Sequence, residues 1–492
     1  MHHTLVISDI HLCEVEPGTG PWMRHRQRAF LPDGEIARML DAVLHAVRGQ
    51  RMTLVLNGDV FDFDAPRVID GRSVCHDLPR DAEHGVPAIA AILDDHPIVL
   101  EALGRVLDEG HDIVLVSGNH DVLLTLPEVR AHLAARLCDA ACALRARDRS
   151  PSARAAIAAR IHFRAWMHVT PDRVVIEHGH LYDPYCSYRY PMAPYDDGGR
   201  EIVATMGSMG TRLLVSRLGY FNPHDDSSVM MSKLGYLLHW ARYYLFSRRW
   251  LALIWAFGTA RILARLWRSR RSFCRARYRG NVIACARETG ERVAAVARHT
   301  RLFEPPAESR FLRVVRELWV DHVFVILVGA ALGALFIGVV GVPLGLLGGI
   351  VPLLLFVLYD RLVPKPPLAE TWLRVGRVMR NVAKIHGARA VVFGHTHTPE
   401  GSWEGDVFIG NSGSWSAAMD GPDGTPRFGE HPFVWLTSGD QGELTGGLYA
   451  WKDGVILPRV VRAPQTEAPP RSEALLRSTE APEIRSDDAR AV

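Results

Sequence analysis

Residues 323–359 form an apolar run that contains neither a charged side chain nor a histidine. A single straight helix of these residues would be about 55 Å long at about 1.5 Å per residue, whereas the hydrocarbon core of a bilayer is about 30 Å thick. Helix-breaking residues gather near the middle of the run, at Gly341, Pro343, Gly345, Gly348 and Gly349. The sequence therefore predicts a hairpin over 322–360, made of two helical arms of about 17 residues each.

Polar residues on both sides of this run are expected to meet at one site, as described below, so the chain must leave and return on one side of any membrane. Arg310, Arg313 and Arg316 precede the run, and Arg361 and Lys365 follow it. This pattern favours a membrane hairpin, spanning or re-entrant, with both ends in the cytoplasm. Two alternatives stay open: a hairpin buried in a soluble core, and a seam between copies of the chain.

The segments outside the apolar run predict an α/β fold. Three short apolar segments end in polar residues, and helix-period segments separate them, which is typical of a β-α-β-α-β order. In such folds the carboxyl ends of the strands share one rim of the sheet, where an active site is expected. The predicted strands lie at 4–11, 52–63, 111–121, 173–180 and 388–401, and the predicted helices at 35–49, 97–110, 127–167 and 368–387.

Carboxylate, imidazole and carboxamide side chains mark the ends of five predicted strands. They are Asp9 and His11; Asp59; Asn119 with His120 and Asp121; His178; and His395 with His397. Such ligands suit Mn²⁺, Fe²⁺ and Zn²⁺, and their number exceeds the needs of one ion. On an extended segment, residues two apart point the same way, so each Asp-x-His or His-x-His pair should face one metal. Neighbouring glycines should let the backbone approach closely or turn sharply.

These blocks, D-x-H, G-D, G-N-H-D, a later His and G-H-x-H, resemble in their order the signature of the calcineurin-like metallophosphoesterase superfamily. The resemblance covers about 1–185 and 370–455 and implies a β-sandwich flanked by helices. It also implies two divalent metal ions, with Mn²⁺ expected before Fe or Zn. Two such ions about 3.5 to 4 Å apart can clamp a phosphoryl group and activate water.

The resemblance assigns a role to each matching residue of this chain. Asp9, His11 and His397 would hold one metal. Asn119, His178 and His395 would hold the other, and Asp59 would bridge the two. His120 would protonate the leaving oxygen or stabilise charge in the transition state, and Asp121 would orient its ring.

Within the superfamily, G-D-x-F-D at 58–62 and E-H-G-H-x-Y-D at 177–183 are similar to UDP-2,3-diacylglucosamine pyrophosphatases, which act on a lipid A precursor at the inner membrane. This chain departs from that pattern, with His120 in place of Arg, His180 in place of Asp, and a longer insertion. His180 could support a metal ligand, contact substrate or be a plain loop residue.

The sequence divides into five parts. Residues 1–185 and 361–461 form the two parts of the metallophosphoesterase domain, 186–321 a helical insertion or lid, 322–360 the hydrophobic hairpin, and 462–492 a disordered tail. Within the insertion, the basic and aromatic segment 248–280 suits anionic lipid headgroups, although a solvated helical face stays open.

Three hypotheses of function follow. The first is a membrane-associated hydrolase of a lipid-linked phosphoester or pyrophosphate. The second is a membrane-anchored phosphatase or phosphodiesterase for soluble phosphoproteins or nucleotides. The third is a non-catalytic membrane scaffold.

The composition adds expectations about compartment and partners. The net charge of +3 and the absence of recognition modules give no sign of a nucleic-acid partner, and the seven cysteines resemble neither a disulfide scaffold nor a zinc motif. No signal peptide is evident before the first strand, so the catalytic part is expected on the cytoplasmic side of a bacterial inner membrane. An oligomer could form through the hairpin.

Overall fold

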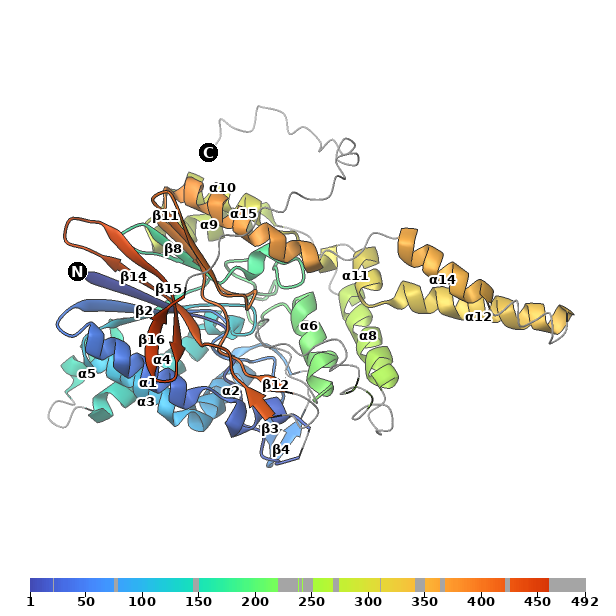
Figure 1. Cartoon of the computed structure of the whole chain (residues 1–492), viewed down its shortest axis with the longest axis horizontal. Helices are drawn as coiled ribbons and strands as arrows, with labels where there is room; N and C mark the ends of the chain where they lie inside the picture. Colours follow the sequence, from blue (N-terminus) through green and yellow to red (C-terminus); the bar gives the residue numbers. More distant parts are fainter. Residues whose placement is uncertain are drawn as a thin grey trace.

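The computed structural model shows an α/β protein whose sheets carry helices on their outer faces (Figure 1). The described residues are 1–20, 22–74, 78–144, 150–219, 238, 241, 251–268, 274–309, 311–340, 350–362, 368–420 and 425–459. The predicted disordered tail at 462–492 and most of segment 220–250 of the insertion lie outside them.

The larger of two mixed sheets has the strand order β16-β15-β14-β1-β2-β5-β6. Its parallel part contains β1 (His2–Ile7), β2 (Arg51–Asn57), β5 (Asp112–Val116) and β6 (Ile161–Arg164). Its antiparallel part contains β14 (Pro432–Ser438), β15 (Leu444–Lys452) and β16 (Val455–Pro458). Two short pairs stand apart: β3 (Arg67–Ile69) with β4 (Arg72–Val74), and β12 (Ala418–Asp420) with β13 (Thr425–Arg427).

The second sheet has the order β10-β11-β9-β8-β7. Its strands are β7 (Met167–Val169), β8 (Val174–Glu177), β9 (Ala390–Phe393), β10 (Glu400–Glu404) and β11 (Val407–Asn411). Strands from the two ends of the chain pair in both sheets, because β1 pairs with β14 and β8 runs parallel to β9. The segments before 186 and after 361 therefore build one folded unit together.

Alternate residues of each strand face opposite layers. Val6 and Val55 of the first sheet join Ile176 and Val392 of the second in one buried cluster between the sheets. Their neighbours, such as Leu54, belong to the core under the helices. Both faces of the central strands are thus buried, which explains their nearly continuous apolar sequence.

Helices cover the outer faces of both sheets. On the first sheet lie α1 (Asp33–Ala46), α2 (Ala82–Asp95), α3 (Pro97–Asp108), α4 (Pro127–Leu144) and α5 (Pro151–Ala158). On the second lie α15 (Leu368–His386) with α9 (Arg275–Thr289) and α10 (Val293–His299) (Figure 1). The prediction of helices near 35–49, 97–110 and 368–387 is confirmed.

The prediction of one helical stretch over 127–167 is wrong at its end. The helix breaks after Ala158, and Ile161–Arg164 forms strand β6 instead. The backbone of β6 pairs in parallel with β5. The hydrogen bonds of this pairing favour a strand over continuation of the alanine-rich helix α5.

The described residues of the predicted insertion form the helices α6 (Met206–Leu213), α8 (Leu251–Arg268) and α11 (Phe311–Glu317), beside α9 and α10. It continues into α12 (Val320–Val340), and α14 (Ile350–Leu362) follows. Figure 1 shows α12 and α14 projecting together from the rest of the protein. The Tyr359 hydroxyl donates to Asp321 Oδ2 at 2.7 Å, which joins the two helices at their base.

The prediction of a hairpin with two arms of about 17 residues is wrong, and the predicted break at 341–349 lies outside the described residues. Among the described helices only Val320–Val339 is long and apolar enough to cross a membrane, and 17% of that window is buried. Helix α14 has 13 residues, about 20 Å at about 1.5 Å per residue, which is short of the about 30 Å hydrocarbon core. Pro352 lies in its first turn, the position where a helix tolerates proline.

A buried hydrogen-bonded chain ties the insertion to the sheet behind the strand ends. The Tyr182 hydroxyl donates to Glu177 Oε1 at 2.8 Å and lies 2.6 Å from His299 Nε2. His299 Nδ1 lies 2.9 Å from His386 Nε2, and His386 Nδ1 lies 2.9 Å from Glu291 Oε2. These contacts run without interruption from Glu177 of β8 through two imidazoles to Glu291.

Replacing Tyr182 with Phe should lower the free energy of unfolding by about 1 to 3 kcal/mol, because it removes a buried hydrogen bond to the Glu177 carboxylate and leaves His299 Nε2 only its 3.1 Å contact with Glu177 Oε1. Denaturant unfolding of the purified chain would measure this change. Tyr449→Phe is the matched control, since that half-buried tyrosine stacks on Phe433 and should tolerate the change. Equal stability of the two variants would contradict the proposed role of the chain of contacts.

Candidate metal centre

The sequence-predicted site residues gather just past the carboxyl ends of five strands. β1 ends at Ile7, two residues before Asp9, and β2 ends two residues before Asp59. Strand β8 ends directly before His178, and β9 ends two residues before His395. Parallel neighbours point these ends toward one rim, so residues from distant parts of the chain meet there.

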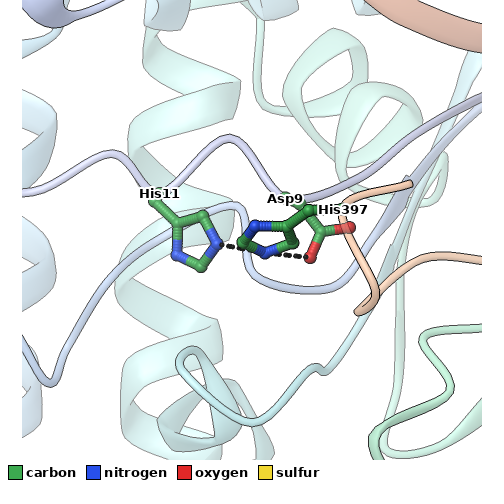
Figure 2. A group of neighbouring side chains, drawn as sticks. All are labelled: Asp9, His11 and His397. Carbon is green, nitrogen blue, oxygen red and sulfur yellow. Dashed lines mark hydrogen bonds and ion pairs between the residues drawn. The ribbon is translucent and has the colours of Figure 1, made fainter. Parts of the chain in front are cut away.

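Asp9, His11 and His397 form the first group that could hold a metal ion. His397 Nε2 lies 3.2 Å from Asp9 Oδ1 and 3.3 Å from His11 Nε2 (Figure 2). Asp9 is fully buried and His11 is 5% exposed. Two imidazoles and a carboxylate at this spacing suit one borderline divalent cation.

Asp59, His178 and His395 form a second group beside the first. His178 Nε2 lies 3.1 Å from Asp59 Oδ2 and 4.0 Å from Asp9 Oδ1, so one imidazole connects both groups. His178 Nδ1 donates to the carbonyl of Asn57 at 2.9 Å, which directs Nε2 toward the carboxylates. The two groups are therefore contiguous.

Asn119 supplies the strongest test of whether the site fits a cation. Its carboxamide oxygen is buried, and no described residue donates a hydrogen bond to it. The next residue, His120, donates its backbone N–H to Asp59 Oδ1 at 2.8 Å, which places Asn119 beside the second group. A buried carbonyl oxygen without a donor is costly unless a cation or water occupies its lone pairs, so this oxygen fits a ligand role.

The backbone at the site is strained. Asp9, His11, Asp59, His395 and His397 have φ between 51° and 67°, and they are five of the eleven described non-glycine residues with positive φ. The prediction that the paired ligands lie on extended segments is therefore wrong, because both pairs follow their strands in left-handed conformation. Such strain is uncommon outside glycine and concentrates at functional sites.

Glycines next to the candidate ligands let the backbone of their loops approach the carboxylates closely, as the sequence predicts. A Cβ on Gly118 would lie 2.6 Å from the Asp59 backbone nitrogen, and one on Gly394 would lie 2.6 Å from Asp9 Oδ2. The Asp9 carboxylate also receives the His395 backbone N–H at 3.1 Å. These glycines let the loops pack directly against the two carboxylates.

The His120 ring is oriented by a different carboxylate from the one predicted. His120 Nδ1 donates to Asp62 Oδ1 at 3.0 Å, and Asp64 Oδ2 lies 3.7 Å away. Asp121 instead accepts the backbone N–H groups of Val60 at 2.9 Å and Gly118 at 2.6 Å. Asp121 thus holds two loops together, because its carboxylate is directed at backbone donors rather than at the ring.

The sequence reasoning also missed Asp183, whose Oδ2 accepts from His395 Nε2 at 3.1 Å. With Cys186, these two residues form a further group that could hold a metal ion. Asp62 and Asp183 both close a motif that the sequence made prominent, G-D-x-F-D and E-H-G-H-x-Y-D respectively. The repeated aspartate at the end of each motif was the available signal.

Charge coupling among these groups is strong. Burial opposes the charged form of His120, but Asp62 and Asp59 outweigh it and raise the pKa of His120 to about 10. Burial and the nearby Asp59 raise the pKa of Asp121 to about 7. For His180, burial and the charges of His178 and His395 all act in one direction and lower its pKa well below the usual value. His180 is therefore a neutral neighbour, and its ring centroid lies 5.4 Å from that of His178.

Compared with models of known protein families and with curated protein sequences, the chain matches none. The structure establishes a mixed α/β protein in which several buried His/Asp groups could hold metal ions.

Replacing Gly118 with Ala should weaken binding of divalent cations, because the new methyl group would overlap Asp59 and displace its carboxylate. We expect a loss of about 10-fold to 100-fold in Mn²⁺ affinity, the range found when supports of a metal ligand are disturbed. Calorimetric titration would measure the affinity. Gly34→Ala is the matched control, since a Cβ there meets no atom within 4 Å; equal affinities would contradict the prediction.

Cation binding should release protons at pH 7. Although burial disfavours the charged form, Asp59 and Asp9 raise the pKa of His178 to about 9 in the metal-free chain. His178 is then protonated at neutral pH, and a cation must displace that proton. The same shift stabilises the metal-free fold below the ordinary histidine pKa of about 6.5, and this stabilisation is lost as the pH rises through about 9.

Titration with Mn²⁺ in buffers of different ionisation enthalpy would count the released protons. We expect the apparent affinity to rise with pH up to about 9 and the proton release to shrink in His178→Gln. Binding without proton release at pH 7 would show that His178 is already neutral or is not a ligand.

Proposed function

We propose that this chain is a metal-dependent phosphoester hydrolase of the calcineurin-like metallophosphoesterase type, with two divalent cations, Mn²⁺ first among them. The observation that carries the proposal is the pair of contiguous buried groups, Asp9 with His11 and His397, and Asp59 with His178 and His395. Their order along the chain also follows the superfamily signature.

The residues can be given definite tasks. Asp9, His11 and His397 would hold one cation, Asn119, His178 and His395 the other, and Asp59 would lie between them. Bound divalent cations stabilise the charge of a phosphoryl group and lower the pKa of an attacking water. The chain itself would fix their ligands through the strained loops and exclude bulk water by burial.

His120 is suited to act on the leaving group. In the metal-free chain Asp62 and Asp59 raise the pKa of His120 to about 10, and Asp62 fixes Nδ1, so Nε2 is the ring nitrogen that we assign to the substrate. A cationic donor at this position can protonate a departing oxygen or stabilise its charge, an effect typically worth about 10²-fold to 10⁴-fold in rate.

A lipid-linked phosphoester or pyrophosphate is the substrate class that we favour, as in the UDP-2,3-diacylglucosamine pyrophosphatases. Support comes from α12, where Phe324, Leu327 and Leu335 are each at least 63% exposed. A core helix of equal length would be mostly buried, so this surface favours lipid. The site would then face the cytoplasmic side of a bacterial inner membrane.

Soluble substrates are the second candidate, since the metal centre does not itself require a lipid. In that case the apolar helix would only anchor a phosphatase or phosphodiesterase. A non-catalytic membrane scaffold would retain the fold without turnover.

The deciding experiment compares two substrates with purified protein in mixed micelles with Mn²⁺: UDP-2,3-diacylglucosamine and bis-p-nitrophenyl phosphate. We expect hydrolysis of the lipid to be preferred, to fall by about 10²-fold to 10⁴-fold in His120→Ala, and to vanish in Asp59→Asn. Asp70→Asn, in an exposed turn, is the matched control.

Hydrolysis of the aryl diester alone would favour a membrane-anchored enzyme for soluble substrates. Failure to hydrolyse either compound, with two cations bound, would favour the scaffold and overturn the proposal.

A further inference from the structure

Helix α8 has two apolar faces, and one of them packs inside the insertion. Ile262 is fully buried and Leu266 is 6% exposed, in a cluster with Met209 of α6 and Val314 of α11. The indole N–H of Trp255 donates to the carbonyl of Leu318 at 2.9 Å. This face fixes α8 against the segment that leads into α12.

The opposite face of α8 is also apolar but is exposed. Its residues follow the i, i+4, i+7, i+11, i+14 spacing of a single helical stripe. We call this stripe the outer face of α8: Leu253, Phe257, Ala260, Ala264 and Trp267. The three large side chains are 52%, 66% and 63% exposed, in chain order. Exposed apolar surface of this extent marks an interaction surface.

The charges beside the outer face identify the partner chemistry. Helix α8 contains no Asp or Glu, and the exposed cations Arg261 and Arg265 lie along the edge of the stripe. The ring of Trp267 lies 6.3 Å from that of Phe311, the first residue of α11, and α11 is followed by α12. Aromatic and aliphatic side chains flanked by arginines suit the headgroup region of an anionic membrane, where the rings enter the interface and the cations meet phosphate.

The arrangement of the helices fits such a surface. In Figure 1, α8 runs crosswise to α12 and α14 at their base. An interfacial helix lies in the membrane plane, whereas a spanning helix lies near the normal, so both orientations can be satisfied together. We propose that the outer face of α8 lies in the headgroup region of an anionic membrane while α12 enters the hydrocarbon core. This inference does not depend on the proposed catalytic function.

A fluorescent label on the outer face tests the proposal. Ala264→Cys would be labelled with an environment-sensitive probe in a full-length chain that carries Cys75→Ser and Cys274→Ser. The remaining cysteines, Cys13, Cys138, Cys142, Cys186 and Cys285, are buried. The control label is Glu101→Cys, at a position on α3 whose side chain is 60% exposed. Each protein is reconstituted into vesicles of phosphatidylcholine with phosphatidylglycerol.

We expect the label at 264 to be protected from the aqueous quencher acrylamide and quenched by lipids with a shallow nitroxide, and the label at 101 to behave in the opposite way. In Arg261→Gln and Arg265→Gln, the ratio of protected to exposed label should fall about fivefold for each cation removed. Vesicles without phosphatidylglycerol should reproduce that loss.

Two outcomes would overturn the proposal. Equal acrylamide quenching at 264 and 101 in anionic vesicles would show that the outer face stays in water. Protection at 264 in detergent without vesicles, rising with protein concentration, would assign the face to a second copy of the chain.

Discussion

The burial of several carboxylates and imidazoles at one rim is the constraint on which the rest of the structure depends. Asp9 and Asp59 are almost fully buried and their charges repel each other. In the metal-free chain they are offset by protons on neighbouring histidines, which explains why the pKa of His178 rises to about 9. A buried carboxylate pair of this kind is stable only with protons or cations beside it, so the folded state requires compensating positive charge at this site.

The two sheets hold the buried carboxylates and imidazoles in fixed positions. Strand ends bring the ligands together, and the left-handed residues aim their side chains inward at a conformational cost that the surrounding core must offset. Behind the rim, the Tyr182 hydroxyl donates to Glu177, the residue before His178. The Tyr182 ring also stacks on Phe393, two residues before His395, with the ring centroids 5.4 Å apart. One buried tyrosine therefore supports the backbone leading to ligands from both parts of the chain.

Much of the site could be predicted because carboxylate, imidazole and carboxamide side chains directly follow five predicted strands, whose carboxyl ends share one rim. Asp9, His11 and His397 meet as the motifs indicate. The partner of the His120 ring could not be predicted from adjacency in sequence: Asp121 is the neighbour, but the loop turns its carboxylate toward backbone N–H groups, and Asp62 reaches the ring from another strand end. Tertiary geometry decided this contact.

The apolar segment illustrates a different limit of prediction. Its composition indicated lipid and a central break, but the unequal helix lengths depend on where each helix begins. Helix α12 starts before the apolar run, at Val320, and thereby places Asp321 next to Tyr359 at the base of α14. Hydropathy alone carries no information about such a polar contact between distant residues.

The contact between His299 and His386 relates the projecting helices α12 and α14 to the candidate metal centre. His299 lies shortly before α11 and α12, and His386 ends α15, which follows α14. Their 2.9 Å contact joins the two ends of the segment that contains α11, α12 and α14. Tyr182 links His299 in turn to Glu177. A second connection runs through α6, because Ser208 Oγ donates to Asp64 Oδ1 at 2.9 Å and Asp64 Oδ2 lies 3.7 Å from His120 Nδ1. Helix α8 packs on α6 through Ile262 and Met209, so the membrane-facing helices and the rim are connected by two separate sets of buried contacts.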